Sequence, residues 1–291
     1  MGRCEMMEAV MIQTAAAVLL IAAAAVRIAL SARYEEQEEM SGTGICQTNG
    51  RKEIQADIAM AFTNEAGTMA VLADGIGNEN TGRLCAQLAA DTVLDRYEPY
   101  HVLNNPAYFF KSTFAEANRR IQMTIGERRG GASLAAAFID KTHLYYAVAG
   151  NVRIALKRGE ELIPLSRGQT MDVLAAEAFE NGSISRQEAI WCMDEKRVWN
   201  YLGMDGFREI ELCGQPIRLK INDTVLLASK GIFEELSWGE MEDILLSGAS
   251  VQEQAEAMVR MAEGKLNPEM DNGSVLLLNI QTEAADEKDK L

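Results

Sequence analysis

Three aspartates stand within or beside apolar stretches of this chain: Asp57, Asp74 and Asp271. Aspartate is disfavoured in β-strands, so its repeated placement there needs a reason. One reason is that the three carboxylates converge on divalent metal ions. Ligands that are all oxygen favour magnesium or manganese over zinc, and two such ions can hold a hydroxide for in-line attack on phosphorus. The residues alone do not exclude the alternative that these are three unrelated aspartates in turns.

Asp74 has the most informative surroundings of the three. It ends the apolar run of residues 69–73, which predicts a buried strand, and it is followed by Gly75 and Gly77. A strand that delivers a carboxylate into a glycine-rich turn suits a hard cation, because the turn lets a main-chain carbonyl approach as a further ligand. An ordinary Asp-Gly turn is the other interpretation.

Composition excludes several other kinds of site. The chain has 291 residues, of which 48% are hydrophobic and 24% charged, as in a folded protein. Its formal net charge of −15 argues against a nucleic-acid partner, which would require a basic face. With only two histidines, a histidine-rich zinc site is excluded and a Ser-His-Asp triad is disfavoured. The five cysteines lie far apart, and we interpret them as reduced packing residues of a cytosolic domain.

Residues 9–26 form an apolar run interrupted by only two polar residues. As a helix the run would be about 27 Å long, close to the hydrocarbon thickness of a bilayer. We therefore predict a membrane anchor over residues 1–30, with a buried core helix or a cleaved signal peptide of a secreted or periplasmic domain as alternatives. Arg27 and Arg33 follow the run and Arg3 precedes it, so we predict a single-pass protein of the cell membrane whose C-terminal domain is cytoplasmic.

The rest of the chain is predicted to be one domain, residues 49–281, between a polar linker (31–48) and an acidic tail (282–291). Helical periodicity predicts helices over residues 81–97, after Pro106, over 171–189 with a break at Gly182, and over 191–202, 238–246 and 251–263. Strands are predicted over residues 54–62, 69–73, 207–212, 216–219, 224–229 and 273–280, with an antiparallel meander of four strands between residues 133 and 165. Strands in groups and helices in pairs predict an α+β fold of packed sheets covered by helices.

The order of short motifs resembles that of the protein phosphatase 2C family, the metal-dependent serine/threonine phosphatases. The resemblance extends from about residue 44 to residue 280, and the order of the segments carries it. These segments are residues 71–77 with the helix containing Ala89 and Ala90, 130–134, 146–153, 188–203, 222–232 and 271–275. The resemblance implies a two-sheet antiparallel β-sandwich flanked by helix pairs.

The resemblance also implies roles for the aspartates. Asp74 would bridge two ions of Mg²⁺ or Mn²⁺, the carbonyl of Gly75 would bind the second ion, and Asp271 would hold the first. Asp57 would act through a metal-bound water. The implied reaction is hydrolysis of phosphoserine or phosphothreonine in a phosphorylated protein.

A cation before Asp57 would neutralise the substrate phosphate in this scheme. Arg51 and Lys52 are the candidates, and the spacing to Asp57 fits Lys52 better. Nothing in the sequence specifies an oligomeric state.

Three positions depart from the family pattern. Lys230 and Asn151 stand where the family has aspartates that bind a third metal, and Ala56 replaces an acidic or amide residue. Lys230 matters most, because its position also serves the first metal. At an effective dielectric constant of about 20, a unit charge and a divalent ion about 4 Å apart interact by roughly 8 kcal/mol. Occupancy of the first metal site is therefore in doubt.

Lys230 could be a surface lysine with no role in the site. If it has a role, two functional outcomes are open. Its ammonium can take the place of the metal and pair with Asp74 and Asp271, which would make a pseudophosphatase that binds a phosphoprotein or regulates a partner without catalysis. Alternatively it can swing outward or toward the substrate phosphate, leaving an atypical metal pair with reduced activity.

Overall fold

The computed structural model describes residues 42–78, 80–192 and 197–281. The predicted anchor, most of the predicted linker and the acidic tail lie outside the described residues and stay predictions. Among the described helices, none has both the length and the apolar character needed to cross a bilayer.

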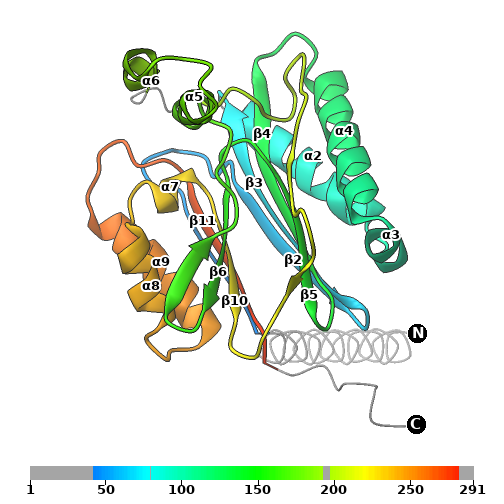
Figure 1. Ribbon diagram of the computed structural model, residues 1–291, viewed down its shortest axis with the longest axis vertical. Helices are drawn as coiled ribbons and strands as arrows, with labels where there is room; N and C mark the ends of the chain where they lie inside the picture. The colour runs from blue at the N-terminus through cyan, green and yellow to red at the C-terminus, as the bar shows by residue number, and fades with distance from the viewer. Residues whose placement is uncertain (1–41, 79, 193–196, 282–291) are drawn as a thin grey trace, which may run out of the picture. The chain divides into compact units, whose positions relative to one another are not determined.

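Two antiparallel sheets face each other at the centre of the domain (Figure 1). The strands of the first sheet are, in spatial order, β1 (Thr43–Thr48), β11 (Gly273–Asn279), β10 (Thr224–Ala228), β6 (Arg153–Arg158) and β7 (Glu161–Pro164). Those of the second are β2 (Ile58–Asn64), β3 (Gly67–Gly77), β4 (Gly130–Ile139), β5 (His143–Ala149) and β8 (Glu211–Leu212), and β9 (Ile217–Arg218) also pairs with β5. The predicted sandwich is confirmed.

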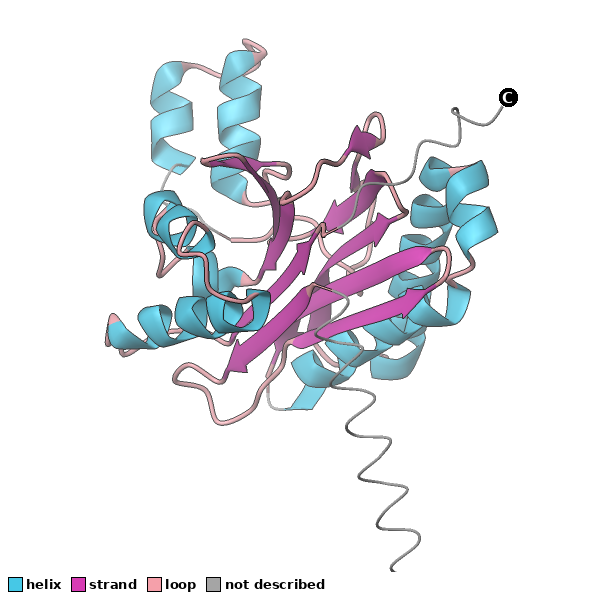
Figure 2. Ribbon diagram, turned by 90° about the horizontal axis from the view of Figure 1, so that it is seen from below, coloured by secondary structure: helices cyan, strands magenta, loops and turns pink. Residues whose placement is uncertain are grey.

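Helices cover the outer faces of both sheets (Figure 2). The second sheet carries α2 (Asn80–Arg96), α3 (Pro99–Asn104) and α4 (Pro106–Ile125), and the first carries α7 (Lys230–Phe233), α8 (Trp238–Leu245) and α9 (Val251–Gly264). A further pair, α5 (Met171–Glu180) and α6 (Arg186–Cys192), lies beyond one end of the sheets (Figure 1).

Strand β3 shows why a continuous apolar run was a reliable signal. Its side chains alternate, so Met69 and Val71 pack under the helices while Ala70 and Leu72 pack against the other sheet, and all four are fully buried. Helix α4 buries its predicted face in the same way, with Phe110, Phe114, Ala117, Ile121 and Ile125 in one core cluster.

The predicted linker is wrong in its last six residues, which form the edge strand β1. Ile45 packs into the core between the sheets and Cys46 into the core under α9. The side chain of Gln252 in α9 closes the open edge, because its amide accepts from the Ile45 N–H at 2.9 Å and donates to the Ile45 carbonyl at 3.1 Å. Ile45 and Cys46 are the apolar residues that β1 packs into the cores, and Gln252 of α9 supplies the hydrogen-bond partner that an edge strand lacks.

The predicted meander is wrong at its middle, because β5 and β6 belong to different sheets. The chain changes sheet at Gly150, whose φ is +86°. A Cβ on Gly150 would lie 2.4 Å from the hydroxyl oxygen of Ser133, so only glycine fits this crossing.

The helix predicted over residues 191–202 is also wrong for most of its described part. Residues 197–202 form an extended strap instead, in which Trp199 donates its N–H to the Gln169 carbonyl and Leu202 exchanges backbone hydrogen bonds with Ala132. These distant partners satisfy the backbone groups that a helix would have satisfied locally.

Candidate active site

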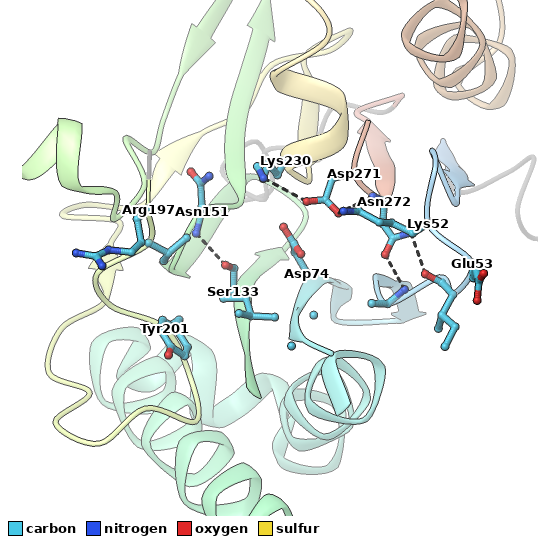
Figure 3. A pocket seen from close by; sticks show the side chains of 16 residues that line it. Lys52, Glu53, Asp74, Ser133, Asn151, Arg197, Tyr201, Lys230, Asp271 and Asn272 are labelled. Carbon is cyan, nitrogen blue, oxygen red and sulfur yellow. Dashed lines mark hydrogen bonds and ion pairs between the residues drawn. The ribbon is translucent and has the colours of Figure 1, made fainter. Parts of the chain in front are cut away.

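A cavity of about 700 Å³ opens at the end of the sandwich (Figure 3). Its walls come from β3, from the loop after β1, from the start of α7, from the loop before β11 and from the strap. Charged and amide side chains are prominent among its lining residues, and they include Lys52, Asp74, Asn151, Arg197, Lys230 and Asp271. Residues far apart in the sequence therefore meet at one spot, as the motif order predicted.

Asp74 lies within β3, opposite Ser133 of β4, and lines the cavity together with Lys230. Gly75 follows where the backbone is closely packed. A Cβ on Gly75 would lie 2.4 Å from the Gly82 carbonyl oxygen and 2.7 Å from that of Ala56. The glycine is thus required for β3 to approach α2 and the loop before β2.

Asp57 immediately precedes β2 and is only 2% exposed. Its Oδ2 accepts hydrogen bonds from the hydroxyls of Ser229 and Ser274, each at 2.7 Å. Its Oδ1 is buried and has no hydrogen-bond partner among the described residues. Burial raises the pKa of Asp57 to about 6, the two hydroxyls oppose that shift, and the charge of Asp271 adds to it.

Asp271 lies between two lysines (Figure 3). The Nζ atom of Lys230 is 3.2 Å from Oδ2, and that of Lys52 is 3.6 Å from Oδ1. Burial lowers the pKa of Lys230, but the carboxylates of Asp271 and Glu234 outweigh it and the net shift is upward. The Lys230 ammonium is therefore charged at neutral pH.

The carboxylates at this site also destabilise one another. Desolvation raises the pKa of Asp74 well above its ordinary value, and the charges of Asp57 and Asp271 raise it further, while Lys230 opposes them. A cation bound at Asp74 would relieve this repulsion. The predicted ion pair of Lys230 with Asp74 is not formed among the described contacts, where the ammonium pairs with Asp271 and Glu234.

The two candidates for the phosphate-neutralising cation lie in different places. Lys52 lines the cavity, whereas Arg51 turns away, with its Nε donating to the Asn267 carbonyl at 3.3 Å. Asn272 fixes the loop that carries them, because its side-chain amide donates to the carbonyls of Asn49 and Ile54 and accepts from the Ala56 N–H. Ala56 thus contributes a backbone contact and no ligand atom.

Asn151 is 3% exposed and lies beside the cavity, where its backbone N–H donates to the Ser133 hydroxyl. Its Oδ1 is buried and finds no hydrogen-bond donor in the described part of the chain.

Sequence reasoning missed four residues of this region. Arg197 and Tyr201 line the cavity from the strap, where a helix had been expected. Ser229 and Ser274 bind Asp57, and both stand inside motif segments, so a signal for them was present. Their role was not evident because it depends on how the two sheets meet.

No protein-family profile matches the chain. Among curated proteins, protein phosphatase PhpP of Streptococcus pneumoniae is 27% identical over 243 residues, covering 79% of this chain and 93% of the relative. Serine/threonine phosphatase stp of Listeria welshimeri is 26% identical over 215 residues, covering 72% of this chain and 82% of the relative. The chain is thus similar to bacterial serine/threonine phosphatases over most of its length, in agreement with its resemblance to the protein phosphatase 2C family.

Solved structures of phosphatase 2C-type proteins share the fold. The serine/threonine phosphatase of S. agalactiae superposes with a TM-score of 0.72 at 19% identity, covering 82% of this chain and 99% of the other. The phosphatase PstP/Ppp of Mycobacterium tuberculosis has a TM-score of 0.66 at 21% identity, with 82% and 98% covered. A structure of the PstP catalytic domain in complex with two manganese ions has a TM-score of 0.61 at 19% identity.

Proposed function

We propose that this phosphatase 2C domain hydrolyses phosphoserine or phosphothreonine in proteins with the help of a divalent metal ion, at reduced activity. The observation that carries the proposal is the meeting of Asp74, Gly75 and Asp271 at one cavity, with Asp57 directly behind it. We further propose that residues 1–30 anchor the domain at the cytoplasmic face of the cell membrane.

The donor atoms at the site fit one ion better than two. Asp74, Asp271 and the Gly75 carbonyl offer oxygen ligands of the kind that Mg²⁺ and Mn²⁺ prefer. Within the described residues, however, no group of three acidic, histidine or cysteine side chains is close enough to hold a metal alone. Lys52 and Lys230 already neutralise part of the negative charge at Asp271. An ion bound at Asp74 and Gly75 would supply Lewis-acid stabilisation of the phosphoryl group.

The protein's own groups have separate tasks in this scheme. Lys52 lines the cavity with a charged ammonium that can hold a phosphate oxygen. Asp57 keeps Oδ1 free of partners within the described chain, so that atom can accept a hydrogen bond from a water molecule and fix its orientation toward phosphorus. The hydroxyls of Ser229 and Ser274 hold the Asp57 carboxylate in place.

A second candidate function is a pseudophosphatase that binds a phosphorylated protein without cleaving it. The 3.2 Å contact between the Lys230 ammonium and Asp271 favours it, because that contact places a cation where the family has an anionic ligand.

Phosphopeptide hydrolysis by three proteins separates the two candidates. These are the unmodified domain, Lys230→Asp, and the control Lys141→Asp, which makes the same charge change in the turn between β4 and β5, away from the cavity. We expect slow manganese-dependent turnover by the unmodified domain and the control, and at least about tenfold faster turnover by Lys230→Asp. Turnover that appears only in Lys230→Asp would identify a pseudophosphatase. Failure of all three to bind Mn²⁺ in calorimetry would exclude the metal-dependent mechanism.

Membrane anchoring has its own test. We expect the full chain to sediment with membranes at its intact mass, and protease added outside the cell to leave the domain undigested. A mass that shows loss of the N-terminal segment would instead indicate a cleaved signal peptide.

A further inference from the structure

Lys230 forms ion pairs with two carboxylates. Its Nζ is 3.2 Å from Oδ2 of Asp271, across the metal-binding cavity, and 3.9 Å from Oε2 of Glu234, one helical turn further along its own segment. Both lysine and glutamate are partly exposed, so the lysine stem is free to turn between the two acids. The ammonium contacts both acids and lies nearer to Asp271.

The Glu234 side has an acceptor that lacks a donor. Glu234 and Asn151 line a second cavity of about 210 Å³, and Asn151 also lines the first cavity together with Lys230. The Oδ1 of Asn151 is buried and unpaired in the described structure. A lysine ammonium carries three donors and no acceptor, so a carboxylate and an amide oxygen together form a suitable second position for it.

Two cations lie near Glu234 at the second cavity, Lys230 and Arg153. Arg153 lies over the Phe233 ring at 4.7 Å, and its charge interacts with the carboxylates of Glu211, Asp172 and Glu234. The contacts of the described residues give Glu234 a single ion pair, the one to Lys230.

We propose that Lys230 alternates between two positions, and that Glu234 and Asn151 form the second one. At Asp271 the ammonium opposes binding of a divalent ion to that carboxylate. At Glu234 and Asn151 it leaves Asp271 and Asp74 free. Glu234 is therefore a positioning residue that acts on the metal site through Lys230, and this inference rests on the proposed metal-dependent function.

This arrangement accounts for the paired departures at positions 151 and 230. The neutral amide of Asn151 holds an ammonium less strongly than a carboxylate would, so the lysine is not trapped on that side. Because metal binds only when the lysine has moved, the apparent dissociation constant is the intrinsic one divided by the fraction of molecules in that state. Removing the Glu234 charge lowers that fraction.

A double-mutant cycle on Mn²⁺ affinity tests the inference. Calorimetry would give the dissociation constant of the unmodified domain, Glu234→Gln, Lys230→Met and the double variant. The control is Asp243→Asn, which removes one negative charge from an exposed position on α8. We expect Glu234→Gln to weaken Mn²⁺ binding about three- to tenfold when Lys230 is present, and to have the much smaller effect of the control when Lys230 is methionine.

The possible results are distinguishable. An equal loss of affinity in both backgrounds would mean that Glu234 acts by its charge or as a ligand, and the two-position inference would be wrong. No effect of Glu234→Gln in the unmodified background would also overturn it, while leaving the proposed function intact. If neither the unmodified domain nor Lys230→Met binds Mn²⁺, the proposed function fails, and this inference fails with it.

Discussion

The hydroxyl of Ser274 donates a hydrogen bond to Oδ2 of Asp57 across 217 positions of the sequence. Ser274 lies in β11 of one sheet and Asp57 enters β2 of the other, so this bond joins the two sheets at the cavity. Ser229, at the end of β10, donates to the same oxygen. The Asp57 carboxylate is therefore also part of the contact that holds the two sheets together.

The metal-free domain should lose stability as the pH rises through about 6. Burial raises the folded-state pKa of Asp57 from 3.8 to about 6, so the fold favours the neutral acid. The corresponding stability is fully present below about pH 4 and is lost as Asp57 ionises near pH 6. A shift of about two pKa units corresponds to about 3 kcal/mol at most.

Urea unfolding with chelator at pH 4.5 and pH 7.5 measures this loss. Asp57→Asn should show a smaller decrease of the unfolding free energy between the two pH values than the unmodified domain. Asp243→Asn, at an exposed position, should retain the full decrease. Equal decreases in all three proteins would contradict the role given to Asp57.

Lys52 and Arg51 should differ sharply in their effect on substrate binding. Lys52 lines the cavity and Arg51 is turned toward the Asn267 carbonyl. We expect Lys52→Met to raise the KM for a phosphopeptide by about tenfold, because a charge-assisted contact to phosphate is lost. Arg51→Met should change KM by less than about twofold. The reverse order would place the phosphate on the other side of the loop.

Arg197 should contribute to phosphopeptide affinity although it contacts neither lysine nor aspartate in the described interactions. It is exposed at the cavity rim and so can meet an anionic group of a bound peptide. Arg197→Met should weaken binding of a phosphopeptide about threefold or more in fluorescence anisotropy, with an effect that decreases at high salt. Arg208→Met, an exposed arginine outside the cavity-lining set, is the matched control, and equal effects would indicate only a loss of net charge.

Gly75→Ala should destabilise the domain and weaken metal binding together. The added methyl group would lie 2.4 Å from the Gly82 carbonyl oxygen, and neither backbone can move without shifting β3 or α2. Overpacking of this kind costs about 1–3 kcal/mol, to be measured by thermal or urea unfolding. Gly239→Ala is the control, since no described heavy atom lies within 4 Å of its added Cβ. Equal melting temperatures for both variants would disprove the close approach.

Much of the fold followed from local patterns. Strand β3 is apolar on both faces because helices cover one side and a sheet covers the other, so a run of apolar residues identified it. Helix α4 was predictable because its buried residues recur with helical spacing after Pro106. The motif segments carried the family resemblance, which implied the two-sheet sandwich that the structure shows.

The errors occur where distant contacts decide the structure. Strand β1 needs Gln252 and β11 as partners, the change of sheet at Gly150 depends on Ser133, and the strap is held by Gln169 and Ala132. None of these pairings leaves a pattern in the local sequence. The same holds for the site, where single residues were found from motifs but the meeting of Lys230 with Glu234 and Asn151 required the packed fold.

The side-chain amide of Gln252 hinders pairing between β1 and a strand of another copy of this domain. It already uses both backbone hydrogen-bonding groups of Ile45, and a Cβ on Gly44 would lie 2.4 Å from the Val251 carbonyl oxygen, so α9 lies directly on the sheet margin. A strand from another molecule would have to displace that helix before it could pair there. Sheet-to-sheet growth into fibres is therefore blocked at this margin even when the domain is concentrated at a surface.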